Sequence, residues 1–163
     1  MCLVIFAFHW SLIPISIMNL NTLGHDSVLA ATIGHGFALG AVIFAMYLRN
    51  KDERFRGIAL PAMISAFFFG VTEPAIYGVT LPMGKPFISA GLGAGFGGAF
   101  VMAMQVAATA WGPSGLLALF VMTAGPHGVA ASVGCYAVGL VICYIMGFIV
   151  TNAMVSVEDV ANA

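Results

Sequence analysis

A carboxylate stands beside a proline directly after an apolar run, in the sequence Thr72-Glu73-Pro74. A charge at the centre of a bilayer costs about 2.5–3.5 kcal/mol on insertion scales, so a partner, water or a proton must offset it. Proline interrupts helical backbone, and interrupted backbone at membrane depth is tolerated where it is buried in protein or lines a wet cavity. A carboxylate can also accept hydrogen bonds from two sugar hydroxyls at once. Glu73 is therefore a candidate substrate-binding residue of a transporter; the alternative is a helix cap or a loop residue in water.

Other polar side chains could complete such a site. Thr72 either contacts the solute or caps the broken helix. Asn19 and Asn21 can donate hydrogen bonds to sugar hydroxyls, and the alternative for both is a role in a turn or a cap. His127 lies in a second break rich in glycine and proline. It is either a turn residue or part of a gate or substrate site.

Two histidines lie within apolar stretches of the chain. His9 precedes Trp10, and His35 lies between two glycines. A single histidine in a membrane helix commonly bonds to a neighbouring helix, and that reading applies to both. The rings of Trp10 and Tyr77 could stack on a sugar, or they could pack inside the protein or anchor it at the membrane interface.

The composition indicates a membrane protein. The 163 residues are 61 % hydrophobic and 7 % charged, whereas a soluble domain carries about 25 % charged residues. The net charge of −1 does not favour nucleic acid as a partner. The sequence has neither a phosphate-binding GxxxxGK[ST] loop nor a cluster of metal-ligating residues, so we expect no cofactor and no metal.

Apolar stretches of two lengths divide the chain. Those long enough to cross a bilayer, which takes about 20 residues, are 28–48, 87–111 and 129–150, with a partial span at 1–18. Two shorter stretches, 58–71 and 115–124, end at proline- or glycine-containing breaks. Short interrupted segments of this kind are typical of transporter binding sites. The sequence therefore predicts an all-α, polytopic membrane protein with transmembrane helices plus re-entrant or broken helical segments.

Charge and glycine content predict two further features. Four of the five basic residues lie together in one loop, at Arg49, Lys51, Arg54 and Arg56. By the positive-inside rule this loop faces the cytoplasm. The glycine-rich segment 91–98 lies in a predicted span and should let another helix approach closely.

Two long motifs connect the chain to a known family. They are "FAFHWSLIPISIMNLNTLGHD" (residues 6–26) and "GVTEPAIYGVTLPMGKPFISAGLGAGFGG" (residues 70–98). Together they resemble the membrane-embedded component C of enzyme II (EIIC) of the bacterial phosphoenolpyruvate-dependent phosphotransferase system, in its β-glucoside branch. The resemblance covers essentially the whole chain in collinear order.

The resemblance implies a function and a division of the chain. Residues 1–152 would be the C-terminal half of the EIIC permease domain, and 153–163 a polar tail, so that the chain is an N-terminally truncated fragment. It would help to carry a β-glucoside across the bacterial inner membrane. His9 matches a histidine that faces the hydroxyl receiving the phosphate, which implies a catalytic role as proton acceptor. None of the three cysteines lies in a setting typical of a phosphocysteine, so this membrane subunit would carry no phosphoryl group itself.

The same resemblance implies partners. These are the sugar, the phosphocysteine domain EIIB, the N-terminal half of EIIC, membrane lipids, and a second copy in the full-length homodimer. Two alternatives stay open at the level of the residues. One is a proton- or ion-coupled transporter in which Glu73 and the histidines relay protons without phosphotransfer. The other is an inactive membrane fragment.

Overall fold

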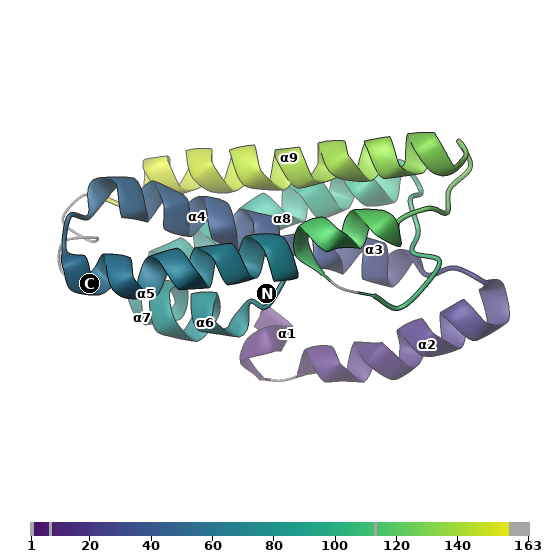
Figure 1. Ribbon diagram of the computed structural model, residues 1–163, viewed down its shortest axis with the longest axis horizontal. Helices are drawn as coiled ribbons and strands as arrows, with labels where there is room; N and C mark the ends of the chain where they lie inside the picture. The colour runs from purple at the N-terminus through teal and green to yellow at the C-terminus, as the bar shows by residue number, and fades with distance from the viewer. Residues whose placement is uncertain (1, 7, 113, 157–163) are drawn as a thin grey trace.

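The computed structural model describes residues 2–6, 8–112 and 114–156, which form an elongated bundle of helices (Figure 1). Three helical stretches are long and apolar enough to cross a bilayer. They are α3 (Ser27–Ile33) continued by α4 (His35–Arg49), α8 (Lys85–Ala103) and α9 (Val129–Met154). In the described residues the only β-type pairings are isolated backbone bridges. The prediction of an all-α polytopic membrane protein is confirmed.

Helices α8 and α9 pack at very short distance. A Cβ atom added to Gly93 would lie 2.7 Å from Cα of Gly147, so a side chain larger than hydrogen does not fit there. The Ser89 and Thr151 hydroxyls, 2.9 Å apart, join the same two helices in a buried hydrogen bond. The predicted close approach of a helix to the segment 91–98 is therefore confirmed. It is the packing expected where helices associate in lipid without a hydrophobic driving force.

The first broken segment forms a helical hairpin that stops partway along the bundle. Helix α5 (Glu53–Ile64) continues as the π-helical turn η2 (Ser65–Phe69) and ends at Gly70. The chain then returns through α6 (Glu73–Ala75), the π-helical turn η3 (Ile76–Thr80) and α7 (Leu81–Met83).

Helix α5 begins earlier than the apolar run from residue 58 suggests. The reason is that Asp52 caps it, since the Asp52 carboxylate accepts hydrogen bonds from the backbone nitrogens of Arg54 and Phe55, both at 3.4 Å. Capping of this kind satisfies backbone donors that would otherwise lack partners. Arg54 and Arg56 therefore lie on the first turns of a helix, and the Arg56 guanidinium sits 4.4 Å from the ring centroid of Tyr47.

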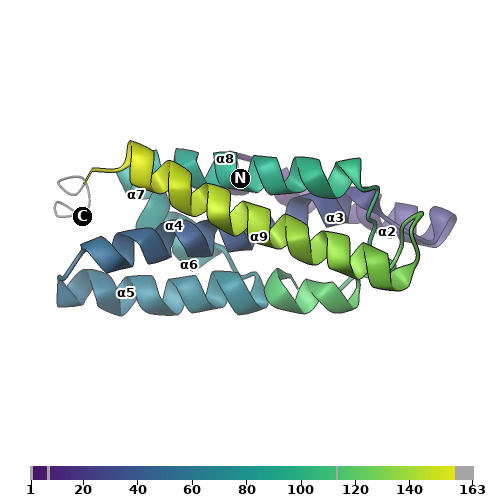
Figure 2. The same cartoon turned by 90° about the horizontal axis from the view of Figure 1, so that it is seen from above.

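The predicted span 87–111 is too long, because α8 ends at Ala103. Gln105 takes a positive φ of 53°, which a helix does not accommodate. The following backbone pairs across the chain instead: the Asp26 nitrogen donates to the Ala108 carbonyl, and the Ala107 nitrogen donates to the Ala124 carbonyl, both at 2.8 Å. The 3₁₀ helix η4 (Gly115–Phe120) follows this segment. Figure 2 shows η4 in line with α5 along the long axis of the molecule.

The two broken segments meet at a pair of glycines. Gly70 and Gly115 both have positive φ, 67° and 66°. A Cβ on Gly70 would lie 2.6 Å from the Gly115 nitrogen, and a Cβ on Gly115 would lie 2.7 Å from the Gly70 nitrogen. Both positions therefore require glycine for two reasons: the backbone conformation has a positive φ, and there is no space for a Cβ atom. We call this contact the glycine junction; it lies next to Thr72 and Glu73.

The N-terminal part is less regular than the predicted partial span. It consists of α1 (Cys2–Ile5), the 3₁₀ helix η1 (Phe8–Ser11) and α2 (Leu12–Leu23), which lies along one side of the bundle (Figure 1).

The last described residues contact the end of α4, since Arg49 Nη1 donates a hydrogen bond to the Val155 carbonyl at 2.6 Å. Residues 153 and 154 belong to α9, and most of the predicted tail, residues 157–163, lies outside the described residues.

Candidate functional site

A cavity of about 660 Å³ lies where the helical hairpin turns, between η2 and α6. This volume suits a small organic solute. Its walls come from the N-terminal segment, from α2, α3, α4, α6 and α8, and from the segment before η4. Among the predicted site residues, His9, Thr72 and Glu73 all line it. The cavity thus joins predicted site residues from distant parts of the sequence, with His9 in η1 and Glu73 in α6.

Glu73 is the acidic residue of this cavity. It lies in the first turn of α6, and its side chain is exposed. The carboxylate oxygens are therefore accessible to a molecule in the cavity. The interruption of the backbone lies just before Glu73, at residues 70–72, whereas the sequence predicts it at Pro74, which occupies the first turn of α6.

Thr72 precedes α6, yet its side chain makes no capping hydrogen bond to that helix. The residue is buried, and its hydroxyl lies 3.3 Å from Nε2 of His35. Nδ1 of His35 lies 2.6 Å from the Thr32 carbonyl, which can only accept, so Nδ1 carries a proton and donates. In the neutral ring, Nε2 then accepts the hydroxyl proton of Thr72. His35 thus bonds from α4 to a separate segment, at the residue that precedes α6, and this partner is a predicted site residue.

His9 faces the cavity from η1 beside Trp10, with the two ring centroids 5.6 Å apart. Its Nδ1 atom is buried and has no hydrogen-bond partner among the described residues. A buried polar atom without a partner costs free energy unless a ligand satisfies it. Among the described residues, no hydrogen bond at Nδ1 holds the His9 ring in place at the cavity wall.

Both tryptophans of the chain line this cavity. Trp10 comes from η1, and Trp111 precedes the second broken segment, with side chains 63 % and 48 % exposed. Large aromatic rings that stay exposed beside polar groups are suited to stack on the apolar face of a sugar. Sequence reasoning considered Trp10 and missed Trp111.

Three predicted site residues do not line the cavity. Asn19 donates to Oδ1 of Asp26 at 2.7 Å and so has a structural partner. Asn21 is exposed on α2, and His127 is exposed in the turn before α9. The structure therefore brings together His9, Thr72 and Glu73 and leaves these three apart. Tyr77 is also engaged elsewhere, since its hydroxyl donates to the Val4 carbonyl at 3.1 Å.

Asp26 is fully buried and ties three segments together. It caps α3 by accepting from the Leu29 nitrogen at 2.9 Å, accepts from Asn19, and pairs through its backbone with Ala108. Burial by itself raises the pKa of Asp26, but hydrogen bonds from Asn19, Ser16 and the backbone outweigh burial and hold the pKa below the ordinary 3.8. Asp26 is thus an ionised structural residue outside the cavity.

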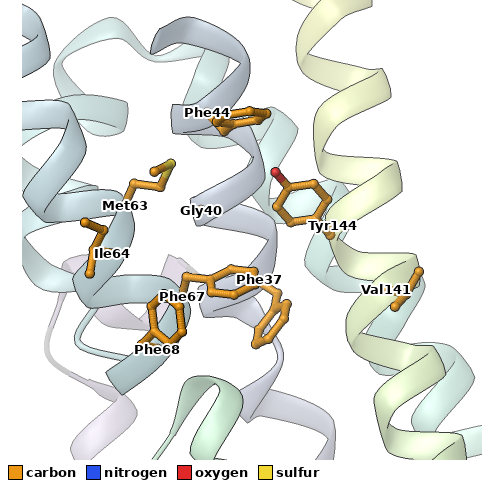
Figure 3. A pocket seen from close by; sticks show the side chains of 9 residues that line it. All are labelled: Phe37, Gly40, Phe44, Met63, Ile64, Phe67, Phe68, Val141 and Tyr144. Atoms are coloured by element: carbon orange, nitrogen blue, oxygen red, sulfur yellow. The ribbon is translucent and has the colours of Figure 1, made fainter. Parts of the chain in front are cut away.

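A second cavity of about 390 Å³ has a different character. Figure 3 shows aromatic and aliphatic side chains from α4, from α5 with η2, and from α9 converging on it. The Tyr144 hydroxyl is the one side-chain oxygen or nitrogen among the described residues that line it: Phe37, Gly40, Phe44, Met63, Ile64, Phe67, Phe68, Val141 and Tyr144. A sugar would lose its hydrogen bonds to water there, so this cavity does not suit one. Within the described residues no cluster of His, Cys, Asp and Glu could hold a metal ion.

Comparison with known proteins gives consistent relatives. The chain is 48 % identical over 98 residues, 60 % of its length, to the β-glucoside-specific EIIBCA component of the phosphotransferase system of Halalkalibacterium halodurans. It is 33 % identical over 149 residues, 90 % of its length, to a component of the same description from Bacillus subtilis. It is 36 % identical over 163 residues, 98 % of its length, to the MurNAc-GlcNAc-specific EIIBC component of Staphylococcus haemolyticus.

The chain spans only part of these relatives. The matched region is 15 %, 24 % and 32 % of their respective lengths. No protein-family model and no solved structure matches the chain. The relatives agree in the transport system and differ in the sugar that their names give. The chain is therefore homologous, over most of its length, to part of the EIIBC and EIIBCA components of the bacterial phosphotransferase system, which confirms the family resemblance in its sequence.

Proposed function

We propose that the chain is the C-terminal part of a sugar-translocating EIIC component and that the sugar binds in the 660 Å³ cavity. The observation that carries this proposal is the convergence of Glu73, Thr72 and His9 on one cavity at a backbone break. The cavity lies in a bundle whose three long helical stretches are long and apolar enough to cross a membrane. Polar-solute sites in transporters are built in this way, at interrupted helices inside the bilayer.

Each residue has a proposed role in binding and transfer. Glu73 accepts hydrogen bonds from sugar hydroxyls, and Thr72 contributes its hydroxyl oxygen. The phosphoryl group moves from the cysteine sulfur of EIIB to the sugar oxygen, and His9 takes the proton that this oxygen loses. Phosphoryl transfer depends mainly on positioning and charge stabilisation, which a membrane cavity can supply without holding the phosphocysteine itself.

We propose a β-glucoside as the sugar. Two relatives described as β-glucoside-specific support this choice, one of them 48 % identical. The exposed rings of Trp10 and Trp111 also suit the apolar faces of a β-glucoside, which its axial C–H groups form. The MurNAc-GlcNAc-specific relative makes N-acetylmuramic acid the natural competitor to test.

The proposal includes partners and an orientation. The partners are EIIB, the N-terminal half of EIIC, lipids of the bacterial inner membrane, and a second copy in a homodimer. The end that carries Arg49, Lys51, Arg54 and Arg56 faces the cytoplasm, where EIIB meets the sugar. The division into a permease part, 1–152, and a tail, 153–163, stays a prediction.

Phosphorylation of transported sugar tests the function. Membrane vesicles would contain the chain together with the additional EIIBC segments of its longer relatives, phosphoenolpyruvate and the soluble phosphotransferase proteins. We expect radiolabelled methyl β-glucoside to accumulate as the phosphate, with a protonophore having no effect. Glu73→Gln should abolish accumulation, and Glu53→Gln, which changes an exposed glutamate at the start of α5, should not. Unphosphorylated sugar that accumulates only with a proton gradient would show an ion-coupled transporter instead.

A further inference from the structure

His35 occupies an unusual place between two helical segments. It is the first residue of α4, and Gly34 and Gly36 flank it. A Cβ on Gly36 would lie 2.5 Å from the Ala66 carbonyl oxygen of η2, so the start of α4 is pressed against the end of the hairpin. The glycines thus allow the imidazole to reach the residue that follows the hairpin turn.

The imidazole also has a fixed tautomer and a fixed partner. The Thr32 carbonyl holds the proton on Nδ1 at 2.6 Å, and Nε2 is left to accept from the Thr72 hydroxyl at 3.3 Å. Thr32 and His35 lie on adjacent turns of the α3–α4 stretch, whereas Thr72 is 37 positions further along the chain. The hydroxyl that would ordinarily cap α6 is therefore directed to a distant helix.

This arrangement determines what Thr72 can offer to a ligand. Its proton is used toward His35, so its oxygen can act only as an acceptor toward any other group. Thr72 is buried and lines the cavity, and burial makes the direction of each hydrogen bond matter more than it does in water. We propose that His35 is a positioning residue of the sugar site, which orients the Thr72 hydroxyl so that its oxygen accepts a hydrogen bond from a sugar hydroxyl.

The inference rests on the proposed sugar-binding function, and one assay separates the two. The full chain is reconstituted in lipid nanodiscs and titrated with methyl β-glucoside and, separately, with N-acetylmuramic acid. Because both tryptophans line the cavity, their intrinsic fluorescence reports binding directly. If the wild-type chain binds neither sugar, the proposed function fails, and this inference fails with it.

Single variants give the first result. We expect His35→Ala to weaken binding roughly 3- to 10-fold, the loss of one oriented hydrogen bond. His35→Gln, whose amide oxygen can accept from Thr72, should recover affinity to within about twofold of wild type. His25→Ala is the matched control, because His25 is exposed and does not line the cavity; its affinity should not change.

A double-mutant cycle separates positioning from direct contact. Thr72→Val alone should weaken binding, and adding His35→Ala to it should cost nothing more. Additive losses would mean that His35 contacts the sugar itself, and the inference would be wrong. Unchanged affinity in a folded His35→Ala chain would also overturn it. If His35→Ala does not fold, the comparison of His35→Gln with Thr72→Val decides, since only the valine variant should lose affinity.

Discussion

Glu73 shows how a single carboxylate can be both accessible and confined. It is exposed in the chain, but it is exposed to a cavity whose other walls are largely apolar. An acceptor in such surroundings forms stronger hydrogen bonds than it does in bulk water, because the local dielectric constant is lower. A hydroxyl-rich solute can satisfy several of its lone pairs at once. These properties support the proposal that Glu73 binds a neutral, polyhydroxylated ligand.

Replacing Glu73 by glutamine tests this match at the level of affinity. The amide keeps the shape but removes the charge and replaces one acceptor oxygen by a donor. Hydrogen bonds to charged groups contribute about 1.5–3 kcal/mol, so sugar affinity should fall roughly 10- to 100-fold. Titration calorimetry in nanodiscs measures the change. A Glu73→Gln chain that binds sugar as tightly as wild type would contradict the role of this carboxylate, and Glu53→Gln serves as the control.

Asp26 predicts a pH dependence of stability. Its pKa is held below 3.8 in the folded protein, so the ionised form favours the fold. This stabilisation is complete at pH values above the unfolded pKa and is lost as the pH falls through the lowered folded pKa. We expect Asp26→Asn to lower the free energy of unfolding by about 1–3 kcal/mol at pH 7, and by much less near pH 3.

Thermal unfolding in detergent, followed by circular dichroism at both pH values, measures this difference. Asp52→Asn is a matched control, because Asp52 also caps a helix but is exposed and should affect stability less. Equal destabilisation by Asp26→Asn at the two pH values would show that the charge of Asp26 is irrelevant.

At the scale of elements, the glycine junction is where the first broken segment ends and the second begins. Alanine at Gly115 would meet the backbone of both Gly70 and Phe67 at less than 3.0 Å while requiring a positive φ. A backbone contact of this kind cannot be relieved by rotating a side chain. We expect Gly115→Ala to destabilise the junction by more than about 1 kcal/mol and to reduce sugar affinity, because Thr72 and Glu73 follow the junction directly.

Gly57→Ala is a control for which the expected change in stability has the opposite sign. Gly57 lies within α5, and no atom outside its own helical turn lies within 4 Å of the place that an alanine methyl group would take. Alanine there should therefore stabilise the helix by about 0.5–1 kcal/mol. Hydrogen exchange at the amides of residues 65–72 would report the junction itself. Faster exchange in Gly57→Ala, or no change in Gly115→Ala, would contradict the role assigned to the junction.

The sequence predicted the elements better than their contacts. A break is found in the first broken segment, but it lies at residues 70–72, where Gly70 has a positive φ, and Glu73 and Pro74 begin helix α6. The close packing of 91–98 follows from its glycines and is found. The end of α8 was misjudged because hydropathy continues past Ala103, while the backbone pairs with Asp26 and Ala124. Pairing across the chain leaves no trace in a hydropathy pattern.

The lining of the candidate cavity could be predicted only where its residues stand out individually. Glu73 and His9 are rare types in an apolar chain, and both line the cavity. Asn19 resembled a sugar ligand by type, yet its side chain is bonded to Asp26. The hydrogen bond of His35 to Thr72 depends on how α4 meets the hairpin, 37 positions away, and no local pattern encodes it.

At the scale of the whole molecule, the orientation in the membrane is testable. Lys51 lies in the basic loop between α4 and α5, and His25 lies in the loop between α2 and α3, at opposite ends of a span. In a chain whose native cysteines are replaced, we expect an impermeant maleimide to label His25→Cys in intact cells. Lys51→Cys should be labelled only after the cells are permeabilised, because basic loops remain in the cytoplasm. The reverse pattern would overturn the proposed orientation.

The end-to-end arrangement of α5 and η4 has a consequence for how a solute could pass. Helix α5 with η2 and the 3₁₀ helix η4 do not form one continuous helix; they meet end to end at a seam made of two glycines without side chains. We expect a shift of about one helical turn, roughly 5 Å, at this seam to be enough to change which compartment a bound molecule faces. Under the proposed function the sugar would bind beside this seam, so a displacement confined to the two short segments would suffice.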